Sequence, residues 1–290
     1  MIPVATIPTR FLWLEITGRC QLTCVHCYAD SSPQGGHGAM TASDWIRLIE
    51  DAAEHGIEMV QFIGGEPTVH PAFPDLVTHA LAVGLRVEMF TNLYRVTPTL
   101  WDLFSRQPGV QLATSYYSDD PTQHDAITGR SGSHTRTREN IAEAVRRKIP
   151  LRVGIIGVND AQRVDQARAD LAALGVTDIG YDQMRAFGRG AHAMNEADTC
   201  GQCGHGTAAI GPDGTVSPCV FTRHAVVGNA RREPLRTVLD SDAFRTQVAW
   251  LDQVRRSEET ACMPNMKCGP RSSCQPSCTP SCSPLRKTFT

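Results

Sequence analysis

The first two-thirds of the chain alternates strand-length apolar runs with amphipathic segments, and this alternation constrains the fold more than any other feature. Repeated strand–helix units imply a parallel sheet covered by helices, either doubly wound or closed into an incomplete barrel. In both architectures ligands bind at the carboxyl edge of the strands. The expected strands cover residues 11–17, 58–65, 85–92, 109–117, 149–158 and 176–184, and the expected helices cover 42–56, 73–84, 97–106, 135–147 and 161–174.

The sequence changes character after residue 190. Residues 208–219 predict a hairpin around a Pro-Asp-Gly turn, and residues 234–254 predict one helix. Residues 262–284 are rich in Pro, Ser and Cys and could not bury a core alone, so we expect a metal site to hold them. The expected organisation is a lead-in over residues 1–8, a barrel domain over 9–190 and a smaller domain over 191–290.

Composition excludes several classes of function. A formal net charge of −2 provides no basic field for binding nucleic acid. The N-terminal residues lack the charged and apolar regions of a signal peptide, and no apolar run approaches the roughly 20 residues of a transmembrane helix. We therefore expect a soluble, cytoplasmic protein that binds neither nucleic acid nor membrane.

The eleven cysteines fall into two groups, with three at Cys20, Cys24 and Cys27 and eight after residue 199. A chain of this size without an export signal does not favour a disulfide framework. Thiolates select zinc, copper(I) or iron–sulfur clusters. Three thiolates on a loop after a strand suit a four-iron cluster with one iron open to a ligand. The alternative is a zinc site completed by His26, His37 or a later cysteine.

A second motif, Gly-Gly-Glu-Pro at 64–67, follows the second expected strand. The C-x3-C-x2-C loop and this motif, in this order, resemble the radical S-adenosylmethionine (radical SAM) superfamily, and the resemblance continues through residues 91–93 and 115–134. It implies an α/β fold, a partial (β/α)6 TIM-like barrel. It also implies that a [4Fe–4S] cluster on Cys20, Cys24 and Cys27 binds SAM. One-electron reduction would then cleave SAM to methionine and a 5′-deoxyadenosyl radical that abstracts a substrate hydrogen.

The same resemblance assigns residues to the SAM molecule. Glycines at 64 and 65 would let the ligand approach the backbone closely, because they lack Cβ. For Arg185, a salt bridge on the barrel rim is an equal alternative to a contact with the methionine carboxylate. Many relatives carry arginine where this chain has Thr128, which leaves the role of Arg130 open. The implied SAM-binding residues are His26, Gly64, Gly65, Glu66, Pro67, Asn92, Ser115 and Arg185.

Other polar side chains follow the same strands. They would position a substrate, act as bases, or only pack at the rim. These residues are His70, Tyr116, Tyr117, Tyr181 and Asp182.

The eight later cysteines resemble the SPASM extension of radical SAM enzymes, which holds two auxiliary [4Fe–4S] clusters. The spacing between Cys262 and Cys268 and before the last cysteine departs from the family pattern, so the partition between clusters stays open. Structural zinc is the alternative. By analogy the first cluster takes Cys200, Cys203, Cys219 and Cys278, and the second takes Cys262, Cys268, Cys274 and Cys282.

Counting cysteines points to a reaction class. Three plus eight cysteines serve clusters, which leaves no thiol of the eleven to return a hydrogen atom as a radical epimerase requires. The count favours net oxidation, with the auxiliary clusters accepting the second electron. We expect a ribosomally made peptide to be cross-linked or dehydrogenated during natural-product maturation. The alternatives are dehydrogenation of a small molecule, formylglycine formation on a protein, peptide epimerisation, an iron–sulfur electron carrier and a zinc-stapled binding module.

The expected partners follow from this reaction. The first strand begins about ten residues from Met1, so we expect no N-terminal leader-binding segment in this chain. A separate protein would then bind the leader, the peptide would dock directly, or the substrate would be small. A flavodoxin or ferredoxin would supply the first electron.

Overall fold

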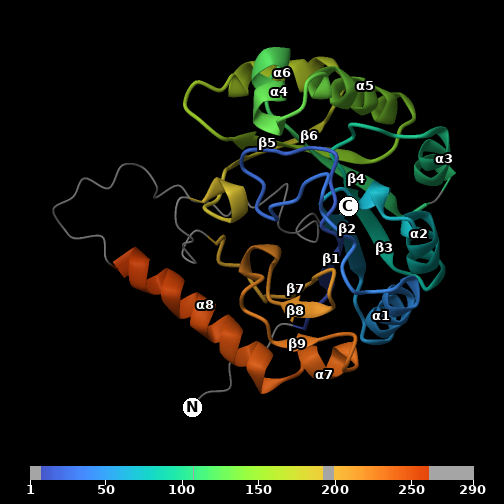
Figure 1. Cartoon of the computed structure of the whole chain (residues 1–290), viewed down its shortest axis with the longest axis vertical. Coiled ribbons are helices and arrows are strands. Elements are labelled where there is room, and N and C mark those ends of the chain that lie inside the picture. The colour runs from blue at the N-terminus through green and yellow to red at the C-terminus, as the bar shows by residue number, and fades with distance from the viewer. Residues whose placement is uncertain (1–7, 107, 192–198, 261–290) are drawn as a thin grey trace.

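One sheet of nine strands runs through the molecule in the computed structural model, which describes residues 8–106, 108–191 and 199–260 (Figure 1). The strand order is β6-β5-β4-β3-β2-β1-β7-β8-β9. The six predicted barrel strands are all present and pair in parallel in sequence order. The strands are β1 (Phe11–Thr17), β2 (Met59–Gly64), β3 (Arg86–Phe90), β4 (Val110–Tyr116), β5 (Leu151–Gly157), β6 (Asp178–Gln183), β7 (Thr207–Ile210), β8 (Thr215–Ser217) and β9 (Gly228–Asn229).

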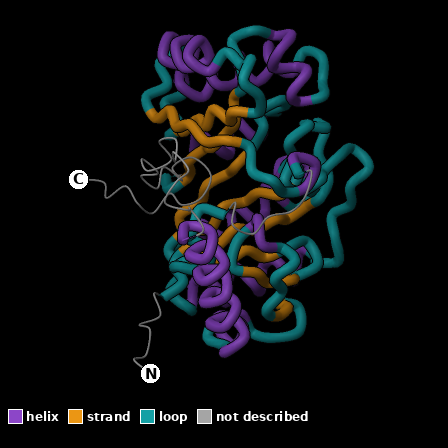
Figure 2. Tube along the Cα trace, turned by 90° about the vertical axis from the view of Figure 1, so that its left-hand side faces the viewer, coloured by secondary structure: helices purple, strands orange, loops and turns teal. Residues whose placement is uncertain are grey.

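The order of β1 to β6 decides between the two predicted architectures. A doubly wound sheet reverses its strand order at a switch point, whereas these strands follow one another without reversal. The sheet is therefore a partial barrel, with the strands in the middle and the helices around them (Figure 2). The barrel helices are α1 (Ala42–Glu54), α2 (Phe73–Ala82), α3 (Pro98–Arg106), α4 (Pro121–Thr128), α5 (Ser133–Arg146) and α6 (Val164–Ala173).

Every residue of β1 is buried, because both faces of the strand are covered. Leu12, Leu14 and Ile16 belong to the large apolar core that the helices complete. Phe11 and Trp13 pack in a second cluster on the inner face of the barrel. Alternation along one strand thus builds two cores and fixes which side chains face the interior.

The inner face also carries a buried ion pair between Glu88 of β3 and Arg152 of β5. Arg152 donates from Nε to Glu88 Oε2 at 2.7 Å and from Nη2 to Oε1 at 2.5 Å. The side-chain amides of Gln61 and Gln111 donate to the same carboxylate. Glu88 is fully buried, so this carboxylate depends on its protein donors for its charge to be tolerated.

The predicted hairpin forms as β7 and β8, which pair antiparallel. The sequence did not predict where it would attach: β7 pairs in parallel with β1, with Phe11 opposite Thr207 and Leu14 opposite Ile210. The C-terminal region therefore continues the barrel sheet at its β1 edge. Such a pairing joins segments nearly two hundred residues apart, and no local pattern encodes it.

The prediction of one helix over 234–254 was wrong. The structure has α7 (Leu235–Leu239) and α8 (Asp242–Thr260), separated at Asp240–Ser241. The Ser241 hydroxyl accepts a hydrogen bond from Phe244 N at 3.1 Å and donates to Val238 O at 2.7 Å. A serine side chain that bonds the backbone in this way ends one helix and starts the next.

The sequence reading also missed α4, which begins at the side-chain cap of Asp120 and ends at Gly129 with φ +66°. Among the described helices none is long and apolar enough to cross a membrane. The cysteines at 262, 268, 274, 278 and 282, with the metal-held tail predicted over residues 262–284, lie outside the described residues.

Candidate functional site

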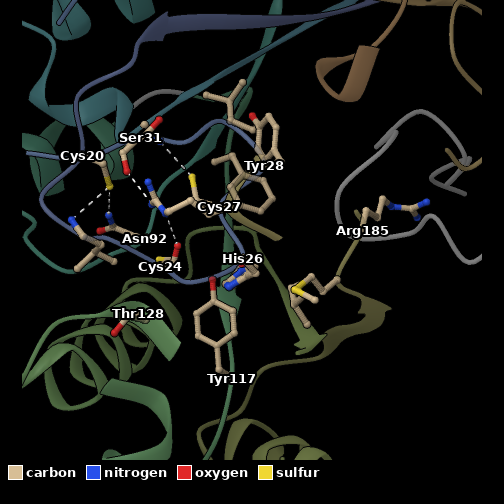
Figure 3. Close-up of a pocket in the computed structure, with 18 of the residues that line it drawn as sticks. Cys20, Cys24, His26, Cys27, Tyr28, Ser31, Asn92, Tyr117, Thr128 and Arg185 are labelled. Carbon is tan, nitrogen blue, oxygen red and sulfur yellow. Dashed lines mark hydrogen bonds between the residues drawn. The ribbon is translucent and has the colours of Figure 1, made fainter. Parts of the chain in front are cut away.

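A cavity of about 1190 Å³, part of it open to solvent, lies at the carboxyl edge of the barrel strands (Figure 3). Among the residues assigned to SAM or its cluster, the cavity wall lacks only Glu66 and Pro67. The predicted residues that line the cavity are Cys20, Cys24, His26, Cys27, Gly64, Gly65, Asn92, Ser115 and Arg185.

The three cysteines share a loop that is fastened to α4. Thr23 N donates to Thr128 O at 3.1 Å, and Val25 N donates to Ile127 O at 2.9 Å. Cys20 Sγ accepts hydrogen bonds from Leu22 N at 3.4 Å and from the amide of Asn92 at 3.6 Å. Cys27 Sγ accepts one from Ser31 N at 3.4 Å.

This donor set fits an iron–sulfur cluster. Cysteine sulfurs that accept N–H hydrogen bonds are the ligands such clusters use, and those bonds tune the cluster. Burial, and then Glu66, raises the pKa of the Cys20 thiol to about 12. Burial, and then Cys20, raises the pKa of the Cys24 thiol to about 12. The free thiols therefore hold their protons, and loading a cluster must release them.

His26 and Tyr117 form an aromatic wall beside the cysteines. Their rings meet edge to face with centroids 5.0 Å apart. Burial, helped by Arg189, lowers the pKa of His26 to about 4, so the imidazole is neutral near pH 7. His26 Nδ1 is buried and has no hydrogen-bond partner among the described residues. A neutral ring with an unused polar atom is suited to contact a heterocyclic ligand such as adenine.

Arg189 is a site residue that sequence reasoning missed. It lies on the short helix η2 (Gly188–Gly190) after β6, and its guanidinium donates to Cys24 O at 2.9 Å and Ser31 O at 2.8 Å. Its backbone N–H donates to Cys27 O at 3.0 Å. Arg189 therefore connects the cysteine loop, which follows β1, to the segment that follows β6, the last strand of the barrel. The available signal was the Gly-Arg-Gly segment directly after the last strand.

Glu66 joins β2 to β3 instead of lining the cavity. Its Oε1 accepts hydrogen bonds from both Thr68 N and Thr68 Oγ1, at 3.2 and 2.7 Å, and from Thr91 Oγ1 at 2.7 Å. Its Oε2 accepts one from Asn92 N at 2.8 Å. Burial raises the pKa of this carboxyl group despite these donors. Because Asn92 also bonds Cys20, Glu66 supports the cluster loop through Asn92.

The structure gives a reason for glycine at positions 64 and 65 that does not involve a ligand. Gly64 has φ +137°, and a Cβ there would lie 2.3 Å from Thr17 O. A Cβ on Gly65 would lie 2.2 Å from Arg19 O. Both positions therefore pack against the backbone that leads into the cysteine loop. A substitution at either position would push that loop away from β2.

We expect Gly65→Ala to destabilise the protein by about 1–3 kcal/mol, because the added methyl group overpacks against fixed backbone. Gly36→Ala is a matched control, since a Cβ at Gly36 meets only Gly38 N, at 3.9 Å. Thermal unfolding of both variants under anaerobic conditions measures the difference. Equal melting temperatures for the two variants would contradict this account of Gly65.

Ser115 and Arg185 line the cavity in different ways. Ser115 lies on β4 opposite Gly154 of β5. Arg185 pairs with Asp182 at 3.0 Å and lies over the Phe221 ring, 5.5 Å from its centroid. In Figure 3 Arg185 lies apart from the three cysteines. The rim salt bridge is thus formed, and a contact between Arg185 and SAM stays a prediction.

The other polar residues predicted at this edge divide into two sets. Tyr117 and Asp182 line the cavity, whereas His70 is buried beside His37 and Tyr181 is exposed on β6. Tyr116 faces the outer helices and donates to Asp170 Oδ2 at 2.8 Å.

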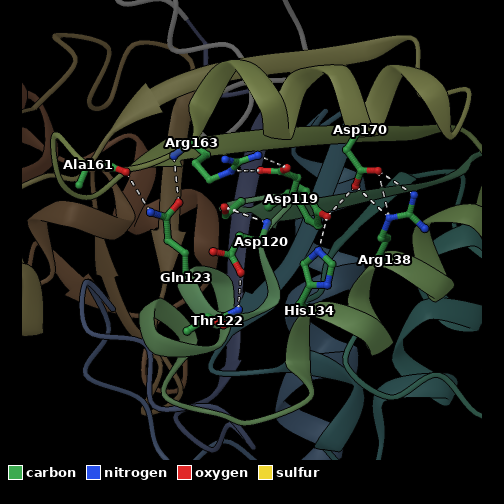
Figure 4. Close-up of polar contacts among 11 residues, drawn as sticks. Asp119, Asp120, Thr122, Gln123, His134, Arg138, Ala161, Arg163 and Asp170 are labelled. Atoms are coloured by element: carbon green, nitrogen blue, oxygen red, sulfur yellow. Dashed lines mark hydrogen bonds and ion pairs between the residues drawn. The ribbon is translucent and has the colours of Figure 1, made fainter.

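Asp170 also pairs with Arg138 at 2.7 Å, and Asp119 pairs separately with Arg163 at 2.7 Å (Figure 4). The first pair lies between α5 and α6, and the second joins the loop before α4 to the residue that precedes α6, both outside the cavity. His70, Tyr116 and Tyr181 are thus absent from the described cavity wall.

The second cysteine group also assembles among the described residues. The Cys203 thiol is hydrogen-bonded to Cys200 and Cys219, and these bonds, followed by burial, raise its pKa. Cys203 and Cys219 are buried. The two residues after Cys219, Val220 and Phe221, line the same cavity as the first cysteine group. Thiols are the donor type that iron–sulfur clusters use, whereas among the described residues no three His, Cys, Asp or Glu side chains are grouped closely enough to hold a single metal ion.

Comparison with known protein families identifies two regions. Residues 14–168 match the radical SAM superfamily. The chain belongs to that superfamily. Residues 200–279 match the SPASM iron–sulfur cluster-binding domain. The predictions of a radical SAM enzyme with a SPASM region and of a partial α/β barrel are thereby confirmed.

Among curated proteins, the chain is 30% identical over 158 residues to a PqqA peptide cyclase from Xanthomonas axonopodis pv. citri (strain 306), across 54% of this chain and 42% of the cyclase. It is 29% identical over 154 residues to an AdoMet-dependent heme synthase from Methanosarcina barkeri (strain Fusaro / DSM 804), across 53% of this chain and 44% of the synthase. The chain thus spans less than half the length of these curated relatives.

Among solved structures, SuiB of Streptococcus suis bound to its precursor peptide SuiA has a TM-score of 0.70 at 14% identity, covering 83% of this chain and 66% of SuiB. The AdoMet-bound anSMEcpe structure has a TM-score of 0.67 at 12% identity, covering 84% of each chain. These likenesses show the fold.

Proposed function

We propose that this protein cleaves SAM at a [4Fe–4S] cluster on Cys20, Cys24 and Cys27 and oxidises a ribosomally made peptide by two electrons. The observation that carries the proposal is one cavity whose wall contains both the three-cysteine loop and the residues that follow Cys219. A radical formed at one side of this cavity would therefore lie near a second group of thiols.

When bound and reduced, the cluster supplies the electron that splits the SAM sulfonium and yields the hydrogen-abstracting radical. The residues of the chain hold and shield the reactants. Leu22, Ser31 and Asn92 donate hydrogen bonds to the sulfurs, and Arg189 fixes the loop backbone. His26 and Tyr117 offer aromatic surface for the adenine.

The segment that follows Cys219 packs directly against the cysteine loop and β1 beside this cavity. Phe221 meets Tyr28 of the cysteine loop edge to face, with centroids 5.1 Å apart. Arg223 pairs with the buried Glu15 of β1, and its guanidinium lies 5.3 Å from the Tyr28 centroid. This packing places an auxiliary cluster held by Cys200, Cys203 and Cys219 close to the cavity, which favours electron transfer to it from an oxidised substrate. It supports net oxidation over epimerisation.

The names of the relatives favour a peptide substrate. PqqA peptide cyclase carries a peptide in its name, and SuiB was solved with a precursor peptide. The heme synthase supports the alternative, oxidation of a small molecule. The remaining parts of the proposal are a second auxiliary cluster on the later cysteines, a domain boundary near residue 190, a cytoplasmic location, a separate leader-binding protein and a flavodoxin or ferredoxin reductant.

Mass spectrometry of short peptides encoded beside the gene, each co-expressed with this protein under anaerobic conditions, tests the proposal. We expect one peptide to lose two hydrogens, and fragmentation would locate the modified residue. A Cys24→Ala variant is the control and should leave the peptide unchanged. SAM cleavage with no peptide modified would favour the small-molecule alternative. Uptake of solvent deuterium without another mass change would establish epimerisation.

A further inference from the structure

Two exposed arginines, Arg130 and Arg136, pack against Tyr94 outside the cavity. The guanidinium carbons of Arg130 and Arg136 lie 5.5 and 5.0 Å from the centroid of the Tyr94 ring. Arg130 Nε also donates to Tyr94 Oη at 3.2 Å. Arg95 is the next residue along the chain and is exposed. We call these four residues the Tyr94 surface.

The positive charge of the Tyr94 surface is poorly balanced. No carboxylate in the described part of the chain forms an ion pair with its three arginines. The neighbouring Asp125 is engaged in capping α5, where it accepts hydrogen bonds from Gly132 N at 2.6 Å and His134 N at 2.8 Å.

The helices add to this charge. α5 begins here with no acidic residue in its first turn, and α3 begins a few residues after Arg95. Helix N-termini carry partial positive charge, so Arg136 in the first turn of α5 opposes helix stability, whereas Arg130 follows the C-terminus of α4, where a cation is favourable. An acidic partner would balance the charge that the fold leaves without a carboxylate.

The Tyr94 surface lies next to the loop that carries Cys24. Thr23, which precedes Cys24, donates from N to Thr128 O at 3.1 Å and from Oγ1 to Gly129 O at 3.3 Å. Gly129 directly precedes Arg130, so two hydrogen bonds and a few covalent bonds connect Arg130 to Cys24. Thr23 is exposed, and Val25, on the other side of Cys24, is 48% exposed. The cysteine loop therefore reaches the outer surface here.

This surface is separate from the cavity. Tyr94, Arg95, Arg130 and Arg136 are absent from the described cavity wall. A substrate bound at them would not reach the reacting groups, whereas a protein bound at them would face Cys24 from outside and leave the cavity free.

We propose that the Tyr94 surface docks an acidic one-electron donor, of the flavodoxin or ferredoxin class, beside the Cys24 loop. This inference rests on the proposed function, since only a cluster on that loop needs such a donor. In each encounter the partner loses one electron and the cluster gains it, and no atom is transferred. Unbalanced arginines would steer the acidic partner, which makes association salt-dependent.

The test uses a bacterial flavodoxin as the probe and the double variant Arg130→Glu/Arg136→Glu. The matched control is Arg232→Glu/Arg236→Glu, which reverses two exposed arginines near β9 and on α7, at the opposite end of the molecule from α4 and α5 (Figure 1). We expect the first variant to bind flavodoxin at least about tenfold more weakly at low salt, and the control to bind as the unmodified protein does.

A second readout separates docking from chemistry. SAM cleavage driven by reduced flavodoxin should fall in the Arg130/Arg136 variant, whereas cleavage driven by dithionite, which needs no docking, should be unchanged. Unchanged flavodoxin affinity in this variant overturns the inference, as does equal weakening in the control variant. Absence of dithionite-driven cleavage in the unmodified protein would instead refute the proposed function. If the charge-reversed protein does not fold, Arg130→Gln/Arg136→Gln provides the same comparison with a milder change.

Discussion

Replacing Cys24 with alanine should reduce SAM cleavage to the background rate while leaving the fold intact. A four-iron cluster on this loop has only three protein ligands, so removing one leaves too few donors to hold it. The loop itself should persist, because Arg189, Thr128 and Ile127 bind its backbone and make no contact that needs the Cys24 thiol. The measurements are 5′-deoxyadenosine formation with dithionite, and bound iron per chain.

Cys219→Ala is the matched control for this experiment. It removes a thiol from the second group, 1% exposed in the structure, and should also lower bound iron. It should retain SAM cleavage, since Cys219 belongs to the auxiliary site, but should lose peptide oxidation. SAM cleavage that survives in Cys24→Ala would place the cluster on other ligands. Loss of cleavage in both variants would mean that the two sites do not act separately.

Much of the candidate site could be predicted because its signals are local. The spacing of Cys20, Cys24 and Cys27 and the Gly64–Pro67 motif each occupy a few adjacent residues, and both follow predicted strands. The carboxyl ends of parallel strands share one edge, so the fold brings these segments together. The structure accordingly places Gly64 and Gly65 in the wall that the cysteines line.

What could not be predicted depends on contacts between distant segments. Arg189 holds carbonyl groups of a loop more than 150 residues earlier in the chain, and the Gly-Arg-Gly segment after the last strand marks the arginine without revealing which carbonyl groups it binds. The pairing of β7 with β1 likewise follows from a free sheet edge and not from the sequence of β7. Glu66 was expected at a ligand, but two threonine hydroxyls and two backbone N–H groups engage its carboxylate.

Replacing Arg152 with methionine should destabilise the protein by about 3–5 kcal/mol, because it leaves the carboxylate of Glu88 buried without its countercharge. Glu88 is 0% exposed, and only the amides of Gln61 and Gln111 would remain as donors. In a protein of this size the change corresponds to a fall in Tm of roughly 10 °C. Thermal unfolding of the cluster-loaded protein under anaerobic conditions measures it.

Two comparisons show whether the buried charge is the cause. Arg163→Met breaks an ion pair with Asp119 whose arginine is 47% exposed, and it should leave Tm close to that of the unmodified protein, since solvent screens such pairs. Glu88→Gln/Arg152→Met removes both charges and keeps the side-chain shapes similar, so it should recover much of the lost stability. If the double variant were as unstable as Arg152→Met, the loss would come from packing under Phe90, whose ring centroid lies 5.7 Å from the guanidinium carbon. The stability of the inner face of the barrel would then depend on the volume of the Arg152 side chain and not on its charge.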